Sequence, residues 1–252
     1  MKIKDFLDNV IYYTSVPKCV CCYDKLDRDD RALCKSCFDK YESVKFRKCS
    51  VCFKHLDECA CSNEYLEHHS VKKLVKVFRY KASLVADEKL PQNELIYNLK
   101  RKRRIDIIDF LSDELIKSIK TSLKYEDAVI TNVPRKKSRV LKYGFDHAQE
   151  IAKAISKKLS IPYVSVLKSK LKNAQKKTHG QKRFDNAEFD FIRRPDSVKG
   201  RRVIIVDDIV TTGASMGKCA MLVKSLGAKE VMGVAVAIAY KDKYTPFEQT
   251  YN

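Results

Sequence analysis

The sequence has no run of the roughly 18 apolar residues that a membrane-spanning helix needs. Its first segment, MKIKDFLDNVIYY, contains charges and lacks the small-residue cleavage site of a secretory leader. No internal repeat and no low-complexity segment is present. We therefore expect a soluble, cytoplasmic protein that is not inserted in a membrane.

Acidic residues are scarce relative to basic ones. The 252 residues include 51 Lys plus Arg against 32 Asp plus Glu, and the formal net charge is +19. A charge of this size bears on binding partners rather than on the fold, and it predicts an anionic partner. The length suits two modest units, since domains usually have about 100 to 200 residues.

Cysteine is abundant and unevenly placed. Nine of the ten cysteines lie between Cys19 and Cys61, and Cys219 stands alone. Without an export signal, we expect metal or thiol chemistry rather than disulfides. Each C-x-x-C turn brings two thiolates onto one tetrahedral ion, so the three consecutive C-x-x-C pairs and the C-x-C pair after them predict structural zinc. The predicted ligands are Cys19, Cys22, Cys34, Cys37, Cys49, Cys52, Cys59 and Cys61.

These eight ligands suffice for one or two zinc ions, with adjacent or interleaved pairing. The alternatives are redox C-x-x-C motifs or buried free thiols, and His55, His68 or His69 could replace a cysteine. The segment has too few apolar residues for a core, whereas structural zinc contributes roughly 10 to 16 kcal/mol in finger peptides. We predict a zinc module over residues 1–64 and a second domain over residues 65–252.

The second domain shows strand and helix patterns in alternation. RRVIIVDD is a continuous apolar run, as in a parallel strand covered on both faces, and VMGVAVAIA is another. Between them, SMGKCAMLVKSLGA indicates a helix that ends at Gly227. Further strands are indicated by SVKKLVKVFRYKAS, DAVITNVP and IPYVSVL, one or two helices by LPQNELIYNLKRKRRIDIIDFLSDELIKSIK, and another helix by HAQEIAKAISKKL. This order predicts an α/β fold with a mostly parallel sheet flanked by helices.

The segment VIIVDDIVTTGAS, from Val203 to Ser215, places two carboxylates at the end of the most apolar strand. Ligands bind at the carboxyl ends of strands in open parallel sheets. The following TTGAS loop leads into a helix, and its hydroxyls and exposed amides suit a phosphate. The carboxylates suit sugar hydroxyls or a magnesium ion that bridges to a pyrophosphate. GASMGKC only imitates a P-loop, because it is one residue short and has Cys219 at the magnesium-binding position.

This segment resembles the 5-phosphoribosyl 1-pyrophosphate (PRPP) motif of type I phosphoribosyltransferases. The resemblance implies that the acidic pair contacts the ribose hydroxyls and that the loop holds the 5′-phosphate, with magnesium accompanying PRPP. The implied PRPP-binding residues are Asp207, Asp208, Thr211, Thr212, Gly213, Ala214 and Ser215.

Together with the cysteine-rich segment, the chain resembles the ComF family of competence proteins, which join a zinc module to a phosphoribosyltransferase-like domain. VPRKKSRVLKYGFDHAQEIAKAI is similar to that family's segment of Val-Pro, basic residues and Gly-Phe, and AQKKTHGQKRFDNAEFDF to its Gln, Arg, Asn-Ala-Phe segment. The chain departs from the family at Tyr143, where Arg is usual, and at Asp146 and His147, where Asn-Gln is usual. Lys142 or Arg139 could compensate for the missing arginine.

Three basic runs carry much of the positive charge: Lys100 to Arg104, Arg135 to Lys142, and Lys168 to Arg183. Any one run can be an ordinary solvated face, but basic runs with aromatic residues nearby are typical of single-stranded nucleic acid binding. Nearby aromatics include Tyr143 and Phe145, and each could instead belong to the core. The predicted DNA-binding residues are Arg135, Lys136, Lys137, Arg139, Lys142, Lys176, Lys177, Lys182 and Arg183.

The sequence leaves three hypotheses for function. The favoured one, implied by the ComF resemblance, is a natural-transformation (DNA-uptake) factor that handles incoming single-stranded DNA and keeps a PRPP-binding site. The alternative is an active phosphoribosyltransferase with an unidentified acceptor, for which no base-recognising residues are evident. The third is a zinc-mediated adaptor for a helicase or channel protein of DNA uptake. Whether turnover occurs, and whether DNA and PRPP share a surface, are not decided by the sequence.

Overall fold

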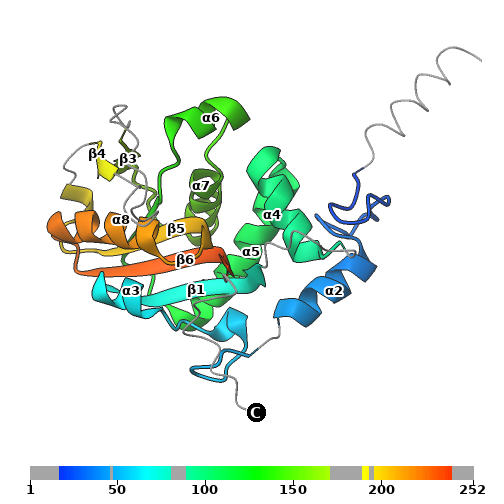
Figure 1. Ribbon diagram of the computed structural model, residues 1–252, viewed down its shortest axis with the longest axis horizontal. Helices are drawn as coiled ribbons and strands as arrows, with labels where there is room; N and C mark the ends of the chain where they lie inside the picture. Colours follow the sequence, from blue (N-terminus) through cyan, green and yellow to red (C-terminus); the bar gives the residue numbers. More distant parts are fainter. Residues whose placement is uncertain (1–16, 46–47, 81–88, 171–188, 193–195, 240–252) are drawn as a thin grey trace, which may run out of the picture.

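The computed structural model describes residues 17–45, 48–80, 89–170, 189–192 and 196–239. Its main sheet has four parallel strands in the order β1-β6-β5-β2 (Figure 1). The strands are β1 (Val71–Tyr80), β2 (Ala128–Asn132), β5 (Arg202–Val210) and β6 (Glu230–Ala239). The predicted parallel sheet is confirmed, and its central strands β5 and β6 are the two apolar runs of the sequence.

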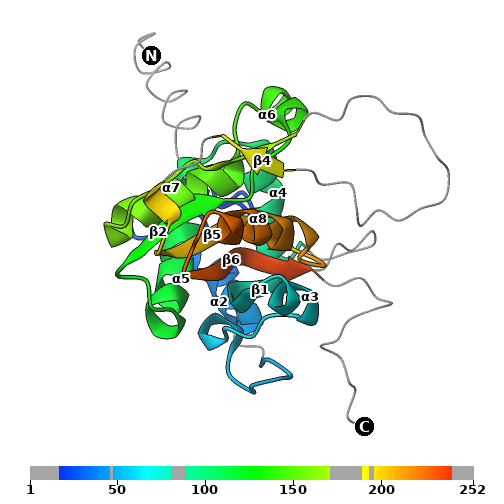
Figure 2. The ribbon, with the colours of Figure 1, turned by 90° about the vertical axis from the view of Figure 1, so that its left-hand side faces the viewer.

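Helices cover both faces of the sheet. Figure 2 shows α5 (Ile105–Ser122) and α7 (His147–Leu159) on one side and α3 (Glu64–His68) and α8 (Ala214–Ser225) on the other. Side chains along β5 alternate between the two resulting cores: Ile204 lies in the core with α5 and α7, and Ile205 lies in the core with α8. Because both faces are covered, the strand needs apolar residues at consecutive positions.

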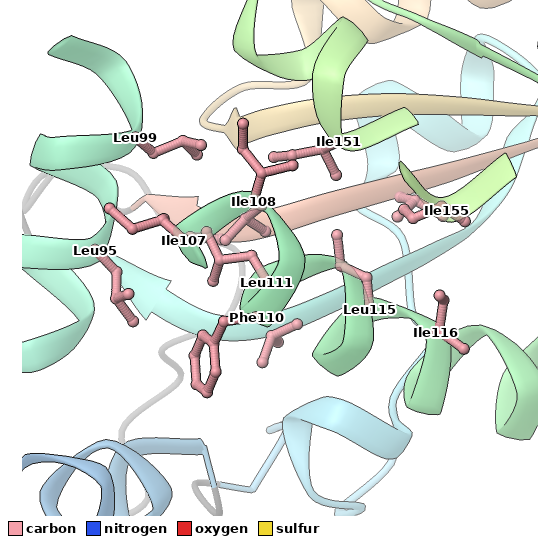
Figure 3. Packing of buried hydrophobic residues seen from close by; sticks show 14 of the residues in the cluster. Leu95, Leu99, Ile107, Ile108, Phe110, Leu111, Leu115, Ile116, Ile151 and Ile155 are labelled. Atoms are coloured by element: carbon pink, nitrogen blue, oxygen red, sulfur yellow. The ribbon is translucent and has the colours of Figure 1, made fainter. Parts of the chain in front are cut away.

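The larger core forms where α4 (Pro91–Arg101), α5 and α7 meet the sheet (Figure 3). Apolar residues recur at four-residue spacing along α5, and Ile107, Leu111, Leu115 and Ile119 are all fully buried. Pro91 lies in the first turn of α4, where a missing amide proton costs nothing. Asp146 caps α7 by accepting a hydrogen bond from the Gln149 amide at 3.2 Å.

The cysteine-rich segment is attached to this core through α2 (Lys35–Lys45). The Tyr41 ring of α2 lies edge-on to Phe78 of β1 at 5.8 Å and to Phe110 of α5 at 5.3 Å, measured between centroids. Lys45 ends α2 in a buried ion pair with Glu114 of α5 at 2.8 Å. One buried cluster therefore contains residues from both predicted domains.

The remaining elements are small. They are the 3₁₀ turns η1 (Leu56–Glu58) and η3 (Asp196–Val198), helix α6 (Lys137–Tyr143), and an antiparallel pair of strands β3 (Leu167–Ser169) and β4 (Phe189–Phe191). No helix among the described residues is both long and apolar enough to cross a membrane.

Two expectations about elements need correction. The segment IPYVSVL does not form a continuous strand: Tyr163 forms an isolated bridge, parallel to Ile130, and Leu167 at its end begins β3. The basic segment after β2 forms α6, a helix that the sequence did not predict. No residue of α6 is buried, so its sequence lacks the apolar periodicity that marks most helices. The other predicted strands and helices are confirmed, including two separate helices α4 and α5.

Candidate functional site

The acidic pair lies near the carboxyl end of β5. Asp208 is 8% exposed, and its Oδ2 atom lies 2.8 Å from Nε2 of His147 and 3.2 Å from Nζ of Lys100. These two partners come from the start of α7 and the end of α4. The end of β5 therefore holds one carboxylate between two basic groups.

The two carboxyl groups have opposite protonation tendencies. Burial and the adjacent charge of Asp208 raise the pKa of Asp207 well above its ordinary value. Burial also opposes ionisation of Asp208, but the hydrogen bond and charge of His147, with the charge of Lys100, lower the pKa of Asp208 overall. Near neutral pH the pair thus offers one ionised carboxylate and one carboxyl group that retains its proton readily.

His147 is buried beside the pair. It is 7% exposed, and the Phe145 ring lies edge-on to the imidazole with centroids 6.4 Å apart. Burial alone would lower the pKa of His147, but interactions with Asp146 and Asp208 raise it above its ordinary value. Its Nδ1 atom is buried without a hydrogen-bond partner among the described residues, 3.9 Å from Oδ1 of Asp146.

A polar network at the end of β2 fixes the neighbouring backbone. The Tyr163 hydroxyl donates to Oδ1 of Asn132 at 2.7 Å, and Asn132 Nδ2 lies 3.4 Å from Oδ2 of Asp146. The same Asp146 oxygen accepts from the Arg135 amide at 2.8 Å. Asp146 therefore ties the start of α7 to the loop after β2, and this loop carries the Arg135 side chain within electrostatic reach of Asp208.

The predicted phosphate loop, Thr211 to Ser215, directly follows β5 and leads into α8. Thr211 is exposed, while the Thr212 hydroxyl accepts from the Ala214 amide at 3.3 Å. Gly213 has φ +84°, a left-handed conformation, and a Cβ atom at this position would lie 2.6 Å from Cγ of Leu66 in α3. The structure brings the predicted loop and the acidic pair to the same edge of the sheet.

The cysteines gather into two groups of four. Cys19, Cys22, Cys34 and Cys37 form the first group, and Cys49, Cys52, Cys59 and Cys61 form the second. Within each group the sulfur atoms lie within 4.8 Å of one another. Pairing is therefore adjacent along the chain, a choice that the sequence left open. The histidines considered as substitutes are in neither group, and Cys21 is a buried thiol outside them.

Both groups fit a tetrahedral metal such as zinc. A Zn–S bond of about 2.3 Å implies a ligand–ligand distance of about 3.8 Å, close to the 3.6 Å between the sulfurs of Cys22 and Cys34. Burial raises the pKa of a thiol, but backbone amides lower the pKa of Cys19 and of Cys49 to about 7. Burial and neighbouring thiols raise the pKa of Cys22 to about 12. Each group thus accommodates one thiolate readily, and a divalent cation would supply the charge for the others.

A buried lysine is hydrogen-bonded to the second group. Lys76 of β1 is 1% exposed, and its Nζ atom donates to Sγ of Cys59 at 3.0 Å and to the Cys61 carbonyl at 2.7 Å. Four thiolates with one divalent ion carry a net charge of about −2, and the Lys76 ammonium offsets about half of it. Sequence reasoning did not identify Lys76, because its strand contains two other lysines and only tertiary contacts distinguish it.

The predicted DNA-binding residues are only partly described. Lys136, Lys137, Arg139 and Lys142 are exposed on or beside α6, and the Arg135 guanidinium lies 4.9 Å from the centre of the Tyr143 ring. Phe145, considered as an aromatic platform, is 6% exposed and belongs to the packed interior. The remaining predicted residues, Lys176, Lys177, Lys182 and Arg183, lie outside the described residues.

The sequence of this chain is similar to those of several known proteins. DNA utilization protein YhgH of Shigella flexneri is 31% identical over 154 residues, which cover 58% of this chain and 67% of that protein. Competence protein F of Haemophilus influenzae is 27% identical over 113 residues, covering 43% of this chain and 49% of that protein. The chain belongs to the ComF family of phosphoribosyltransferase-like proteins.

The ComF assignment agrees with a match of residues 146–251 to the family model described as "Phosphoribosyl transferase domain". This region contains β5, the acidic pair and the loop, so the resemblance expected from the sequence is confirmed. Among solved structures, the purine phosphoribosyltransferase of Pyrococcus horikoshii is 19% identical. That alignment covers 57% of this chain and 93% of the Pyrococcus horikoshii chain, with a TM-score of 0.34.

Two contacts at the acidic pair were missed by sequence reasoning. His147 was noted only as a departure from the family's usual Asn-Gln, and Lys100 only as the start of a basic run. Their shared partner Asp208 lies far away along the chain. The position of His147, two residues after Phe145 of the family's Gly-Phe pair, was the one signal available.

Proposed function

We propose that this chain is a DNA-utilization factor of natural transformation that handles single-stranded DNA and binds PRPP, or a related phosphoribosyl ligand, at Asp207–Ser215. The main support for this ligand site is that two carboxyl groups with opposite pKa shifts lie next to a loop suited to phosphate, at one edge of a parallel sheet. Sugar hydroxyls need acceptors where phosphates need amides and hydroxyls, and this edge presents both.

In this proposal the loop amides at the start of α8 receive the 5′-phosphate, and Thr211 and Thr212 add hydroxyl donors. The ionised Asp208 accepts from a ribose hydroxyl, and Asp207 lies beside it. Lys100, which pairs with Asp208, and Arg135, which interacts electrostatically with it, provide positive charge for the pyrophosphate. The carboxyl groups of Asp207 and Asp208 would help to hold a magnesium ion, which would neutralise part of the pyrophosphate charge.

Single-stranded DNA is proposed to bind along α6. Figure 1 shows this helix standing apart from the layers of the sheet, and its Lys137, Arg139 and Lys142 are exposed. Positive charge beside an aromatic ring, here Tyr143, suits a flexible strand whose bases can stack and whose phosphates need cations. The names of the relatives, a DNA utilization protein and a competence protein, support a role in handling DNA.

The test is calorimetric titration with PRPP and magnesium, with and without a short single-stranded DNA. We expect the double change Asp207→Asn and Asp208→Asn to abolish PRPP binding. The matched control is Asp127→Asn, an exposed aspartate that precedes β2 at the opposite end of the sheet. Unchanged PRPP affinity in the double variant would overturn the site, and absence of DNA binding by the wild type at low salt would overturn the DNA role.

An active phosphoribosyltransferase is the second candidate, and the match to the phosphoribosyl transferase domain model favours it. Transfer would break the bond between C1 of the ribose and pyrophosphate and form a bond from C1 to a nucleophile on the acceptor. Release of pyrophosphate from PRPP in the presence of a panel of bases would support this activity. Tight PRPP binding without pyrophosphate release from any base would favour a ligand-binding role alone.

A further inference from the structure

The second cysteine group and the phosphate loop are connected by a very short piece of chain. Cys59 and Cys61 belong to the group, Asn63 follows two residues later, and α3 then runs from Glu64 to His68. Helix α3 packs on α8 and on the loop that precedes it. Any displacement of the cysteine group would therefore be passed to the loop through a single turn of helix.

Asn63 joins the two structures with one side chain. Its Oδ1 atom accepts from the Leu66 amide at 2.9 Å and so caps α3. Its Nδ2 atom donates to the Thr212 carbonyl in the phosphate loop at 3.4 Å. The residue that fixes the start of α3 thus also fixes the backbone of the loop.

Close packing strengthens this connection. Leu66 is fully buried against Gly213, and a Cβ atom at Gly213 would lie within 2.6 Å of its side chain. One turn further along α8, a Cβ atom at Gly217 would lie 2.9 Å from the Tyr65 ring. Glycines at these two positions allow α3 to touch the backbone of the loop and of α8, so the surfaces have little room to slide.

On its other side the cysteine segment is fixed to β1. Cys61 forms an antiparallel bridge with Lys73, and the Leu74 amide donates to the Ala60 carbonyl at 3.0 Å. Lys76 adds hydrogen bonds to Sγ of Cys59 and to the Cys61 carbonyl. The segment from Cys59 to Asn63 therefore lies between the edge strand and the phosphate loop.

The first cysteine group has different neighbours. Cys37 lies in α2, and the Lys18 carbonyl beside Cys19 accepts from Nη2 of Arg104 at 3.1 Å. Its buried surroundings are α2, α4 and α5, on the opposite face of the sheet from α3 and α8. The chain thus contains two Cys₄ groups of the same chemistry, of which one touches the element that supports the loop.

We propose that α3 positions the phosphate loop and that metal binding by the second cysteine group is energetically coupled to ligand binding at that loop. Asn63 and Leu66 are the positioning residues, and the first group is not coupled. This inference rests on the proposed phosphate-binding role of the loop. Coupling between two sites is reciprocal, so a ligand on the loop must also change the metal affinity of the second group.

The test uses cadmium-loaded protein and ¹¹³Cd NMR, which gives one signal for each group. The change Lys76→Met identifies the signal of the second group, because it removes a contact with Cys59 but no ligand. We expect PRPP with magnesium to shift this signal and to slow the loss of its cadmium to a chelator about 5-fold, with the first group unchanged.

Asn63→Ser separates positioning from helix capping. Serine caps a helix about as well as asparagine, but it has no amide group to reach the Thr212 carbonyl. We expect this variant to keep the wild-type unfolding midpoint and to lose most of the coupling, whereas Asn63→Ala loses both. PRPP binding with equal responses from the two groups, or with no response from the second, would overturn the inference.

A second measurement separates this inference from the proposed function. If PRPP does not bind the wild type, the proposed ligand is wrong, and hydrogen exchange then tests α3 without a ligand. Cys61→Ser should speed amide exchange at residues 211–215, and the matched Cys22→Ser should not. Should Cys61→Ser fail to fold, Asn63→Ala replaces it. Unchanged exchange in the loop would overturn the positioning role.

Discussion

Asp208 shows how one side chain depends on residues from three elements. Its own strand places it at the edge of the sheet, but its charge is maintained by His147 of α7 and Lys100 of α4. Without them, burial beside Asp207 would favour the neutral acid. The three groups therefore titrate as a unit rather than as separate residues.

This dependence predicts the behaviour of the imidazole. Asp208→Asn removes one of the two carboxylates that raise the pKa of His147, so this pKa should fall. Titration of the imidazole by ¹⁵N NMR measures the change, and Asp127→Asn serves as the control. An unchanged His147 titration in the Asp208 variant would contradict the observed pairing.

Two left-handed glycines give a second prediction. Gly144 and Gly213 have φ of +79° and +84°, but only Gly213 has a neighbour, Leu66, where a Cβ atom would lie. Gly144→Ala should cost about 1 kcal/mol of unfolding free energy through backbone strain. Gly213→Ala should cost about 2 to 4 kcal/mol, because overpacking adds to that strain. Urea unfolding measures both values, and equal losses would mean that Leu66 moves aside freely.

At the scale of elements, α2 is fastened to α5 by a buried ionic contact. Glu114 is 4% exposed and pairs with Lys45 of α2 and with Lys117. The Tyr41 hydroxyl also donates to it at 3.1 Å. Burial raises the pKa of Glu114, but the two lysines outweigh it and lower the pKa overall.

Glu114→Gln should cost roughly 2 kcal/mol at neutral pH, since the buried Lys45 ammonium loses its α5 partner but keeps its ion pair with Glu42. A lowered folded-state pKa means that the carboxylate stabilises the fold above its unfolded pKa of about 4.3. This contribution is lost as the pH falls through the folded-state value. Denaturant midpoints of wild type and variant should therefore converge in acid. Glu64→Gln, at an exposed site, should change stability little at any pH.

The elements also show what sequence patterns can predict. β5, β6, α7 and α8 were predicted because each carries a long, regular apolar pattern. The strand predicted over IPYVSVL was wrong along most of its length, because its short alternation suits a strand, yet only Pro162 to Val164 lie against β2. α6 was missed because it has no buried face. Residue types alone indicated the acidic pair, the loop and the cysteines, whereas the pairing of the cysteines depends on tertiary contacts.

At the scale of the whole molecule, the positive charge predicts salt-dependent DNA binding. If α6 contacts phosphates, changing Lys137, Arg139 and Lys142 to Gln should weaken binding and reduce the slope of log K against log salt by about 2, at roughly 0.7 per contact. Fluorescence anisotropy with a labelled oligonucleotide measures this slope. The control changes Lys120, Lys124 and Lys229 to Gln, which are exposed and lie toward the amino ends of the strands. Equal effects of both triple changes would indicate a general charge effect and exclude a defined site on α6.

The pairing of β1 with β6 also affects how the protein is made. Val71 pairs with Val231, so the edge strand β1, beside the second cysteine group, cannot pair until β6, the last described strand, has been made. At about 5 to 20 residues per second, the ribosome needs roughly 10 to 30 s to synthesise the chain between them. During that interval the cysteines have left the ribosome, but the sheet that later packs beside them has not formed. Early metal capture would protect the nascent thiols from oxidation and mispairing until β6 completes the sheet.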